Sequence, residues 1–326
     1  MKIPRLTTLA PVAVLVVLAL FPVIGIPLSW LNYLFFFFIY LALASMWNLL
    51  AGYTGLICLC PPAFVGLAGY TLAISTLLGV PFQVGLIAGA AVAALFAVLI
   101  SYPVFRMKGI YFAIGTLILP QALKAWFSYW RPVGDEWQGM GAGYAVTGLA
   151  GVTLGDKYWL ALAVAAVSIF LVYIILRAKL GLGLTAIRDN ENTAASSGIN
   201  IYRLKLISFI IAAFIMGLAG AIYFIYSPRI NPVGGFSMRW LIMPLMATVI
   251  GGEGVEEGPI MGAAVITFLT FLLADYGAWS LLIQGIVLVV VVVLMPQGIA
   301  GLLRQVGAYR FPQKLFQAAE AKIHRT

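Results

Sequence analysis

The sequence predicts an all-α integral membrane protein, a polytopic bundle of about ten transmembrane segments that includes broken or half-length helices. Apolar residues make up 63% of the 326-residue chain and charged residues only 9%, a balance outside that of ordinary soluble domains. No Asp, Glu, Lys, Arg or His occurs between residues 6 and 105. That stretch is long enough for about four bilayer crossings of roughly 20 residues each, so we expect the chain to be surrounded by lipid.

Hydropathy along the chain gives ten candidate segments. They lie near residues 8–26, 29–50, 63–79, 82–105, 109–127, 158–176, 204–226, 241–250, 259–274 and 279–295. Segment 241–250 is too short to cross about 30 Å of hydrocarbon alone, so it is either extended by its flanks or a half-helix inside the bundle. The first segment follows two basic residues like a signal peptide, but its apolar run is longer than usual and we expect it to stay uncleaved.

The basic residues predict the topology, because Lys and Arg near the ends of spans favour the cytoplasmic side. With a cytoplasmic N-terminus and ten crossings, 14 of the 19 Lys and Arg residues fall on the inner face and 5 on the outer. An odd number of crossings would place the basic C-terminal tail outside. We therefore predict that both termini are cytoplasmic, and that residues 1–326 form one transmembrane domain with a cytoplasmic loop at 178–203 and a cytoplasmic tail at 297–326.

Two interruptions of apolar helix share one pattern, GxxG followed by proline and then glycine, one beginning at Gly52 and one at Gly251. Backbone broken at membrane depth is tolerated where protein or a water-filled cavity satisfies it, and paired breaks are a pointer to a transport pathway. The alternatives are ordinary loops and close helix packing through small residues. The candidate pathway residues are Gly52, Tyr53, Gly55, Pro62, Phe64, Gly66, Tyr111, Gly251 and Gly254.

The most polar part of the chain, residues 184–200, is predicted to form a short helix at the surface. We expect Ile187, Ala194, Ala195 and Gly198 to share a small or apolar side, Arg188, Asp189 and Glu191 to be exposed, and Gly198 to end the helix. Such a segment suits docking into a cleft of another protein. The alternative is a solvated loop whose charges only keep it in water.

Signatures of catalysis and of cofactor binding are missing from the sequence. There is no GxxxxGK[ST] phosphate loop, so we expect any ATP to be bound by other subunits. The one histidine, His324, lies in the polar tail, and no spaced His and carboxylate cluster indicates a metal. Cys58 and Cys60 are interpreted as small buried thiols. The net charge of +9 is scattered at helix ends, so nucleic acid is not an expected partner.

Five runs together resemble the LivM-type permeases, which are subunits of ABC importers for branched-chain and other hydrophobic amino acids. They are GYTGLICLCPPAFVGLAGYTLA from Gly52, KGIYFAIGTL from Lys108, AIRDNENTAASSGINIYRLKLISFIIAAFIMGLAGAIY from Ala186, GGEGVEEGPIMGAA from Gly251 and VLMPQGIAGLL from Val293. The resemblance implies a multi-pass permease of the inner membrane with a second, LivH-like permease, two LivG/LivF-like ATPase subunits and an external solute-binding protein. It also implies that the loop carrying Glu191, Ala194 and Gly198 is the segment that couples to the ATPase.

The resemblance leaves the substrate open, because Cys60-Pro61-Pro62 stands where family members often carry Gly-His-Ala, and Thr193 replaces a customary alanine. Similar permeases move urea, short amides or aromatic acids as well as leucine-like amino acids. The main alternative function is an ion-coupled secondary transporter or a channel, which would commonly use an intramembrane Asp, Glu or His. An integral membrane enzyme ranks third, because convergent catalytic groups are not visible in the sequence.

Overall fold

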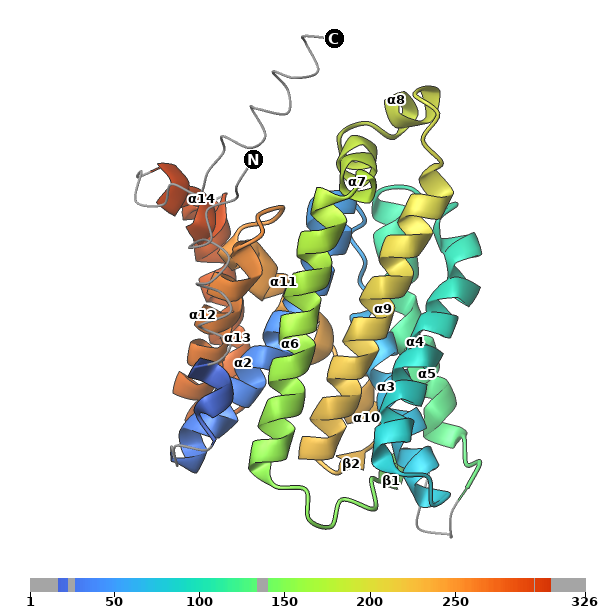
Figure 1. Ribbon diagram of the computed structural model, residues 1–326, viewed down its shortest axis with the longest axis vertical. Helices are drawn as coiled ribbons and strands as arrows, with labels where there is room; N and C mark the ends of the chain where they lie inside the picture. The colour runs from blue at the N-terminus through green and yellow to red at the C-terminus, as the bar shows by residue number, and fades with distance from the viewer. Residues whose placement is uncertain (1–16, 23–26, 134–139, 296, 306–326) are drawn as a thin grey trace.

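The computed structural model describes residues 17–22, 27–133, 140–295 and 297–305. It confirms the predicted all-α membrane architecture, a bundle of long apolar helices (Figure 1). In the described part of the chain, six helical segments are long and apolar enough to cross a membrane: 28–53, 82–104, 110–129, 154–177, 201–226 and 232–251. Pro61–Leu77, Gly258–Leu272 and Leu282–Val291 are shorter apolar helices.

The elements follow one another in the order that hydropathy predicts. They are α2 (Leu28–Asn48), the π-helical turn η1 (Leu49–Tyr53), α3 (Pro61–Leu77), α4 (Phe82–Val104), α5 (Ile110–Tyr129), η2 (Met140–Ala142), β1 (Tyr144–Ala145), α6 (Leu154–Arg177), α7 (Lys179–Asp189), α8 (Glu191–Ser196), α9 (Ile201–Tyr226), β2 (Arg229–Ile230), α10 (Pro232–Gly235), α11 (Arg239–Gly251), α12 (Gly258–Leu272), η3 (Ala274–Tyr276), α13 (Ala278–Leu294) and α14 (Gly298–Gln305). Each predicted segment from 29–50 onward therefore has a helix.

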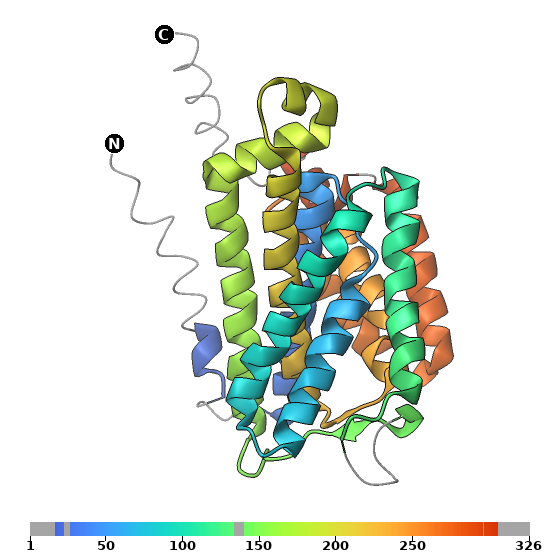
Figure 2. The same cartoon turned by 90° about the vertical axis from the view of Figure 1, so that its right-hand side faces the viewer.

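The two ends of the bundle differ. Figures 1 and 2 show α7 and α8 projecting from one end, which we call the α7–α8 end, and Figure 1 places α14 there as well. At the opposite end, β1 and β2 form a small antiparallel sheet in which Tyr144 pairs with Ile230 and Ala145 with Arg229. The loop and the start of the tail that we predict to be cytoplasmic thus share one end.

The predicted short segment 241–250 is extended by its flanks. The Asn231 side chain accepts a hydrogen bond from the Gly234 backbone N–H at 2.6 Å and caps α10. From α10 the chain continues into α11, so that Pro232–Gly251 gives 20 residues of span. The first of the two alternatives for this segment is therefore confirmed.

The predicted first segment, 8–26, lies mostly outside the described residues. Residues 17–20 are helical. The Tyr158 hydroxyl donates a hydrogen bond to the Leu18 carbonyl at 2.7 Å, and the Trp159 indole donates one to the Ala19 carbonyl at 3.0 Å. Two aromatic side chains near the start of α6 thus bind this segment to α6.

Small residues let the central helices approach closely. A Cβ added to Gly217 of α9 would lie 2.7 Å from the Ala93 Cβ of α4, and one added to Gly220 would lie 2.7 Å from the Val65 Cα of α3. Glycine is required at such contacts because apolar helices in lipid associate through close van der Waals packing. The packed group of α3, α4 and α9, with α2 beside it, holds the broken segments in place.

Candidate functional site

The first break is an ordered departure from helix between α2 and α3. Helix α2 loosens into the π-helical turn η1, the chain turns at Gly55 with a φ of +72°, and α3 starts at Pro61. The extended segment between them is satisfied by side chains: the Trp47 indole donates to the Cys58 carbonyl, and the Leu59 N–H donates to the Thr116 hydroxyl, both at 3.0 Å. Protein groups therefore replace the lost helical hydrogen bonds, as irregular backbone inside a membrane protein requires.

The second break, between α11 and α12, is closely packed. Gly252 has a φ of +121° and Gly254 a φ of +72°, both in the region that favours glycine. A Cβ on Gly251 would clash with the Gly258 carbonyl, and one on Gly262 would clash with the Ala247 carbonyl. These glycines therefore allow α11 and α12 to pack backbone against backbone.

The two breaks contact each other through Asn48, which is 1% exposed in the last turn of α2. Its side-chain oxygen accepts a hydrogen bond from the Gly254 N–H at 2.8 Å, and its amide nitrogen donates one to the Val255 carbonyl at 3.0 Å. A Cβ on Gly52 would lie 2.5 Å from the Gly254 nitrogen. The two breaks, which are about 200 residues apart in the chain, thus lie in direct contact and are joined by the Asn48 side chain.

Arg188 of α7 closes over this contact from the α7–α8 end. Its Nη1 donates a hydrogen bond to the Gly52 carbonyl at 2.9 Å, and its Nη2 lies 3.0 Å from the Asp189 carboxylate. The Arg188 side chain is 40% exposed. A Cβ on Gly254 would be 3.3 Å from Nη1. One guanidinium group of α7 therefore touches both breaks.

The positive charge of Arg188 also acts on the Glu253 carboxylate in the second break. Partial burial raises the pKa of Glu253, and the positive charge of Arg188 opposes that shift. Glu253 belongs to the connection between α11 and α12, at the α7–α8 end. The electrostatics of the second break are therefore tied to the position of α7.

The polar segment forms two helices, α7 and α8, rather than the single short helix predicted. Asn190 between them is extended, and its side chain accepts a hydrogen bond from the Thr193 N–H at 3.1 Å, which starts α8 anew. After α8, Gly198 has a φ of +81°, and the N–H groups of Gly198 and Ile199 donate to the carbonyls of Ala195 and Ala194. This is a Schellman ending, and it confirms Gly198 as the helix stop.

The predicted common side of this segment is wrong in part. Ile187 and Ala194 are buried, at 4% and 3% exposure, whereas Ala195 and Gly198 are exposed. The reason is the interruption at Asn190, which changes the rotation of α8 relative to α7. Ala195 and Gly198 are thus presented outward, where another protein can reach them.

Arg188 and Asp189 are exposed as predicted, whereas Glu191 is only partly exposed because it forms an ion pair. Its carboxylate lies 3.0 Å from the Lys205 ammonium group of α9, and the Lys205 side chain is only 11% exposed. Beside it is a polar groove of about 370 Å³ lined by residues of the first break, the α4–α5 connection, α7, α8 and α9: Thr54, Gly55, Lys108, Ile187, Arg188, Asp189, Asn190, Glu191, Asn192 and Lys205. Three of the predicted coupling residues, Arg188, Asp189 and Glu191, therefore line the same groove as Thr54 and Gly55 of the first break, whereas Ala194, Ala195 and Gly198 do not line it.

The other predicted pathway residues are dispersed. Tyr53, Pro62 and Phe64 are buried, and the Phe64 ring packs against Phe209 with centroids 5.6 Å apart. Tyr111 is 74% exposed on α5. A Cβ on Gly66 would clash with the Phe236 ring. Close packing, one of the alternatives for the breaks, is thus present in this conformation, and a pathway along these residues stays a prediction.

Sequence reasoning missed two residues of the site. Asn48 is an amide in an otherwise apolar segment, one turn before Gly52, and that isolation was its signal. Lys205 carried no such signal, because its role depends on where α8 lies. The buried, free thiols of Cys58 and Cys60 agree with their interpretation, and their sulfur atoms are 3.2 Å apart. Among the described residues there is no group of three metal-ligating side chains, and His324 lies outside them.

Comparison with known proteins identifies the family. The model of the branched-chain amino acid transport system / permease component family matches residues 29–293. The chain belongs to this family. It is 25% identical over 310 residues to the high-affinity branched-chain amino acid transport system permease protein LivM of Salmonella typhimurium, covering 87% of this chain and 71% of that protein. Escherichia coli LivM is 25% identical over 82% of this chain and 68% of its own length.

A second type of permease is also similar. Over 142 residues, 43% of this chain and 44% of the relative, the identity to Escherichia coli LivH is 28%. No solved structure matches. Family membership and the apolar helices make this chain a multi-pass permease subunit of the inner membrane, and the family consists of ABC transporter permeases rather than enzymes. The resemblance drawn from the sequence is thereby confirmed, and it favours an ATP-driven permease over the ion-coupled alternative.

Proposed function

We propose that this chain translocates branched-chain or other hydrophobic amino acids, and that α7 and α8 transmit the ATPase cycle to the two broken segments through Arg188. The observation that carries the proposal is the hydrogen bond from Arg188 to the Gly52 carbonyl. A subunit without a phosphate loop has to receive the free energy of ATP binding by mechanical contact. The ATPase can shift the permease between two states only if it contacts those states differently.

The geometry gives this contact a short route. The exposed Ala195 and Gly198 offer a surface on α8 for the ATPase. A displacement of α7 would move Arg188, which holds the Gly52 carbonyl, and Asn48 joins that break to Gly254. The first and second breaks would therefore move together, although they belong to opposite halves of the chain.

The partners follow from the family. Two relatives that match most of the chain are named as permeases of a branched-chain amino acid transport system, and part of the chain is similar to LivH. We infer that a LivH-like permease pairs with this chain, that two LivG/LivF-like ATPase subunits bind at the α7–α8 end, and that a solute-binding protein delivers substrate at the β1–β2 end. This arrangement makes the α7–α8 end and both termini cytoplasmic.

The interior of the bundle supports an uncharged route. Among the described residues, Lys205 is the one buried side chain of an ionisable acidic or basic residue, and it pairs with Glu191 at the α7–α8 end. Coupling to protons or sodium commonly relies on ionisable groups in mid-membrane. The charges of an amino acid substrate can instead be met by helix ends and backbone groups rather than by ionised side chains.

The test changes the exposed surface of α8 in the assembled transporter. Gly198→Trp should abolish solute-stimulated ATP hydrolysis and uptake, because the residue needs a positive φ and lies on the outer surface. Gly198→Asn is the matched control, since asparagine tolerates that conformation and adds little bulk. Ala195→Trp keeps the helix ending and adds bulk alone, so it should also reduce copurification of the ATPase.

The outcome distinguishes docking from a solvated loop. If Gly198→Trp and Ala195→Trp both keep wild-type stimulation, uptake and ATPase copurification, then α8 is only a connection and the proposal fails. The double exchange Arg188→Glu with Glu191→Arg is less informative, because Arg188 and Glu191 each have a separate partner within this chain.

A further inference from the structure

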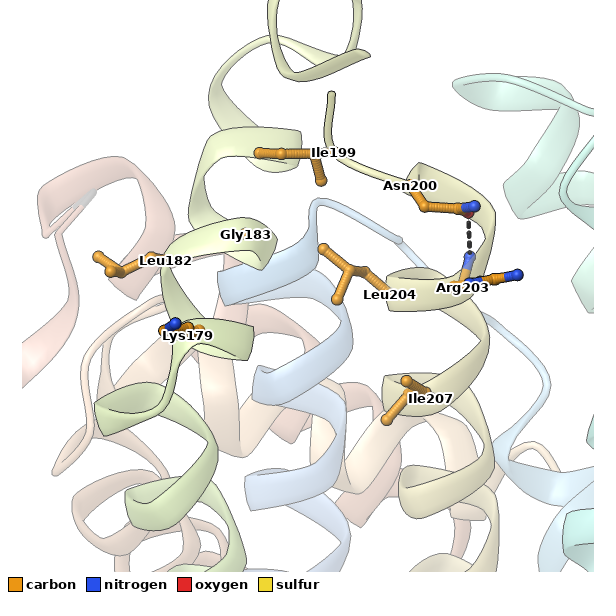
Figure 3. Close-up of a pocket in the computed structure, with 8 residues that line it drawn as sticks. All are labelled: Lys179, Leu182, Gly183, Ile199, Asn200, Arg203, Leu204 and Ile207. Atoms are coloured by element: carbon orange, nitrogen blue, oxygen red, sulfur yellow. Dashed lines mark hydrogen bonds between the residues drawn. The ribbon is translucent and has the colours of Figure 1, made fainter. Parts of the chain in front are cut away.

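A second groove lies between α7 and the start of α9, outside the contact with the breaks. Its volume is about 500 Å³, and it is lined by Lys179, Leu182, Gly183, Ile199, Asn200, Arg203, Leu204 and Ile207. Figure 3 shows Lys179 on the α7 side and Arg203 on the α9 side, with the Leu204 side chain between them, Ile207 one turn further along α9, and the Arg203 side chain extended outward from the groove. The groove therefore has basic groups at its rim and an apolar interior.

The positive charges of Lys179 and Arg203 have no acidic partner among the residues that line this groove. No acidic side chain contributes to it, and among the described residues neither Lys179 nor Arg203 forms an ion pair. The Asn200 side chain is already engaged, because it accepts a hydrogen bond from the Arg203 backbone N–H at 3.0 Å (Figure 3). Both basic side chains are exposed.

The groove also continues onto the surface that faces lipid. Ile207 belongs to the membrane-spanning helix α9 and is 40% exposed, and Leu182 at the other side of the groove is 65% exposed. An exposed apolar side chain on a membrane span normally contacts acyl chains. Basic residues close to such a span, at its cytoplasmic end, attract anionic headgroups.

We propose that this groove binds one anionic phospholipid, its phosphate between Lys179 and Arg203 and the upper part of an acyl chain along Leu204 and Ile207. The arrangement suits a lipid better than a soluble anion, because a phosphate alone would make no contact with the apolar side chains of Leu204 and Ile207. Lipid held there touches both α7 and α9. It would thus brace the root of the segment that we propose to contact the ATPase, and the site rests on that proposal only for the cytoplasmic placement of the α7–α8 end.

The experiment uses native mass spectrometry to count the lipids that the assembled transporter retains. The transporter is purified from nanodiscs of phosphatidylcholine that contain a small fraction of phosphatidylglycerol. Each basic residue near an anionic headgroup contributes about a fivefold gain in affinity, so Lys179→Gln with Arg203→Gln should weaken phosphatidylglycerol binding roughly thirtyfold. The matched control is Arg106→Gln with Arg177→Gln. These two guanidinium groups each lie over a tyrosine ring, and neither lines the groove.

Three results would overturn the proposal. One is equal retention of phosphatidylcholine and phosphatidylglycerol by the wild-type transporter. Another is a loss in the control variant as large as in the groove variant. The third is displacement of the bound lipid by glycerol phosphate at low concentration, since a site that needs no acyl chain is a phosphate site. A single phosphatidylglycerol lost only from the groove variant would support it.

Discussion

Replacing Asn48 by leucine tests whether the two breaks act as one unit. The substitution nearly conserves volume, so little cavity forms, but it removes two hydrogen bonds, to the Gly254 N–H and the Val255 carbonyl. A net contribution of about 1 kcal/mol for each bond gives roughly 2 kcal/mol. Both backbone partners are half-buried, so water can reach them and the larger cost of a fully buried orphan does not apply.

A change of about 2 kcal/mol corresponds to roughly a thirtyfold shift of an equilibrium. If the contact between the breaks transmits the ATPase cycle, Asn48→Leu should lower uptake by up to that factor. The assay is solute uptake by reconstituted vesicles, together with the thermal unfolding of the purified transporter, which reports the loss of stability.

Thr248→Val is the matched control. Thr248 is buried in the last turn of α11, and its hydroxyl donates to the Ala44 carbonyl of α2 at 3.1 Å. This variant therefore also removes a buried hydrogen bond to α2, but one that does not join the two breaks. Both variants should be less stable, and only Asn48→Leu should transport poorly. Wild-type uptake by Asn48→Leu, or an equal defect in both variants, would refute the reasoning.

The remaining predictions concern packing, topology and nucleotide. Gly66→Leu should impair transport because a side chain there would clash with the Phe236 ring. Gly285→Leu should be tolerated, because no atom lies within 4 Å of a Cβ at that position. Equal uptake by both variants would remove Gly66 from the site. Cysteines at Asn190 and Gln313 should react with an impermeant label only from the cytoplasm and one at Gln138 only from outside, and outside labelling of Gln313 would make the crossing count odd. The purified chain alone should hydrolyse no ATP, and robust hydrolysis free of contaminants would contradict the need for separate ATPases.

Hydropathy could predict the bundle because lipid imposes long apolar segments, and each of them from 29–50 onward has its helix. The two GxxG breaks were visible as well, since glycine and proline punctuate helices wherever they occur. The contact between the breaks was not predictable, because it depends on how α2 packs beside α11 and α12. Only then does Asn48 reach Gly254.

For the α7–α8 segment as well, the sequence predicted the local features but not how the two helices are oriented. Its polar composition and the stop at Gly198 were readable, since a glycine after a short helix favours a left-handed turn. The division at Asn190 was not anticipated, although asparagine is a common helix cap. Missing it placed Ala195 on the same side as Ile187, whereas the structure exposes Ala195 and buries Ile187.

The central claim is that Arg188 carries the ATPase cycle to the breaks, and the number of solute molecules transported per ATP hydrolysed tests it most directly. Arg188→Gln loses a charge-assisted hydrogen bond to the Gly52 carbonyl. Because the side chain is 40% exposed, the low end of the usual range applies, about 1.5 kcal/mol or roughly tenfold.

In reconstituted transporters, Arg188→Gln should keep ATP hydrolysis, because α8 still offers its docking surface, while transport per ATP falls roughly tenfold. Arg177→Gln, at the same end but stacked on Tyr173, should keep the wild-type ratio. A wild-type ratio in Arg188→Gln would contradict the account.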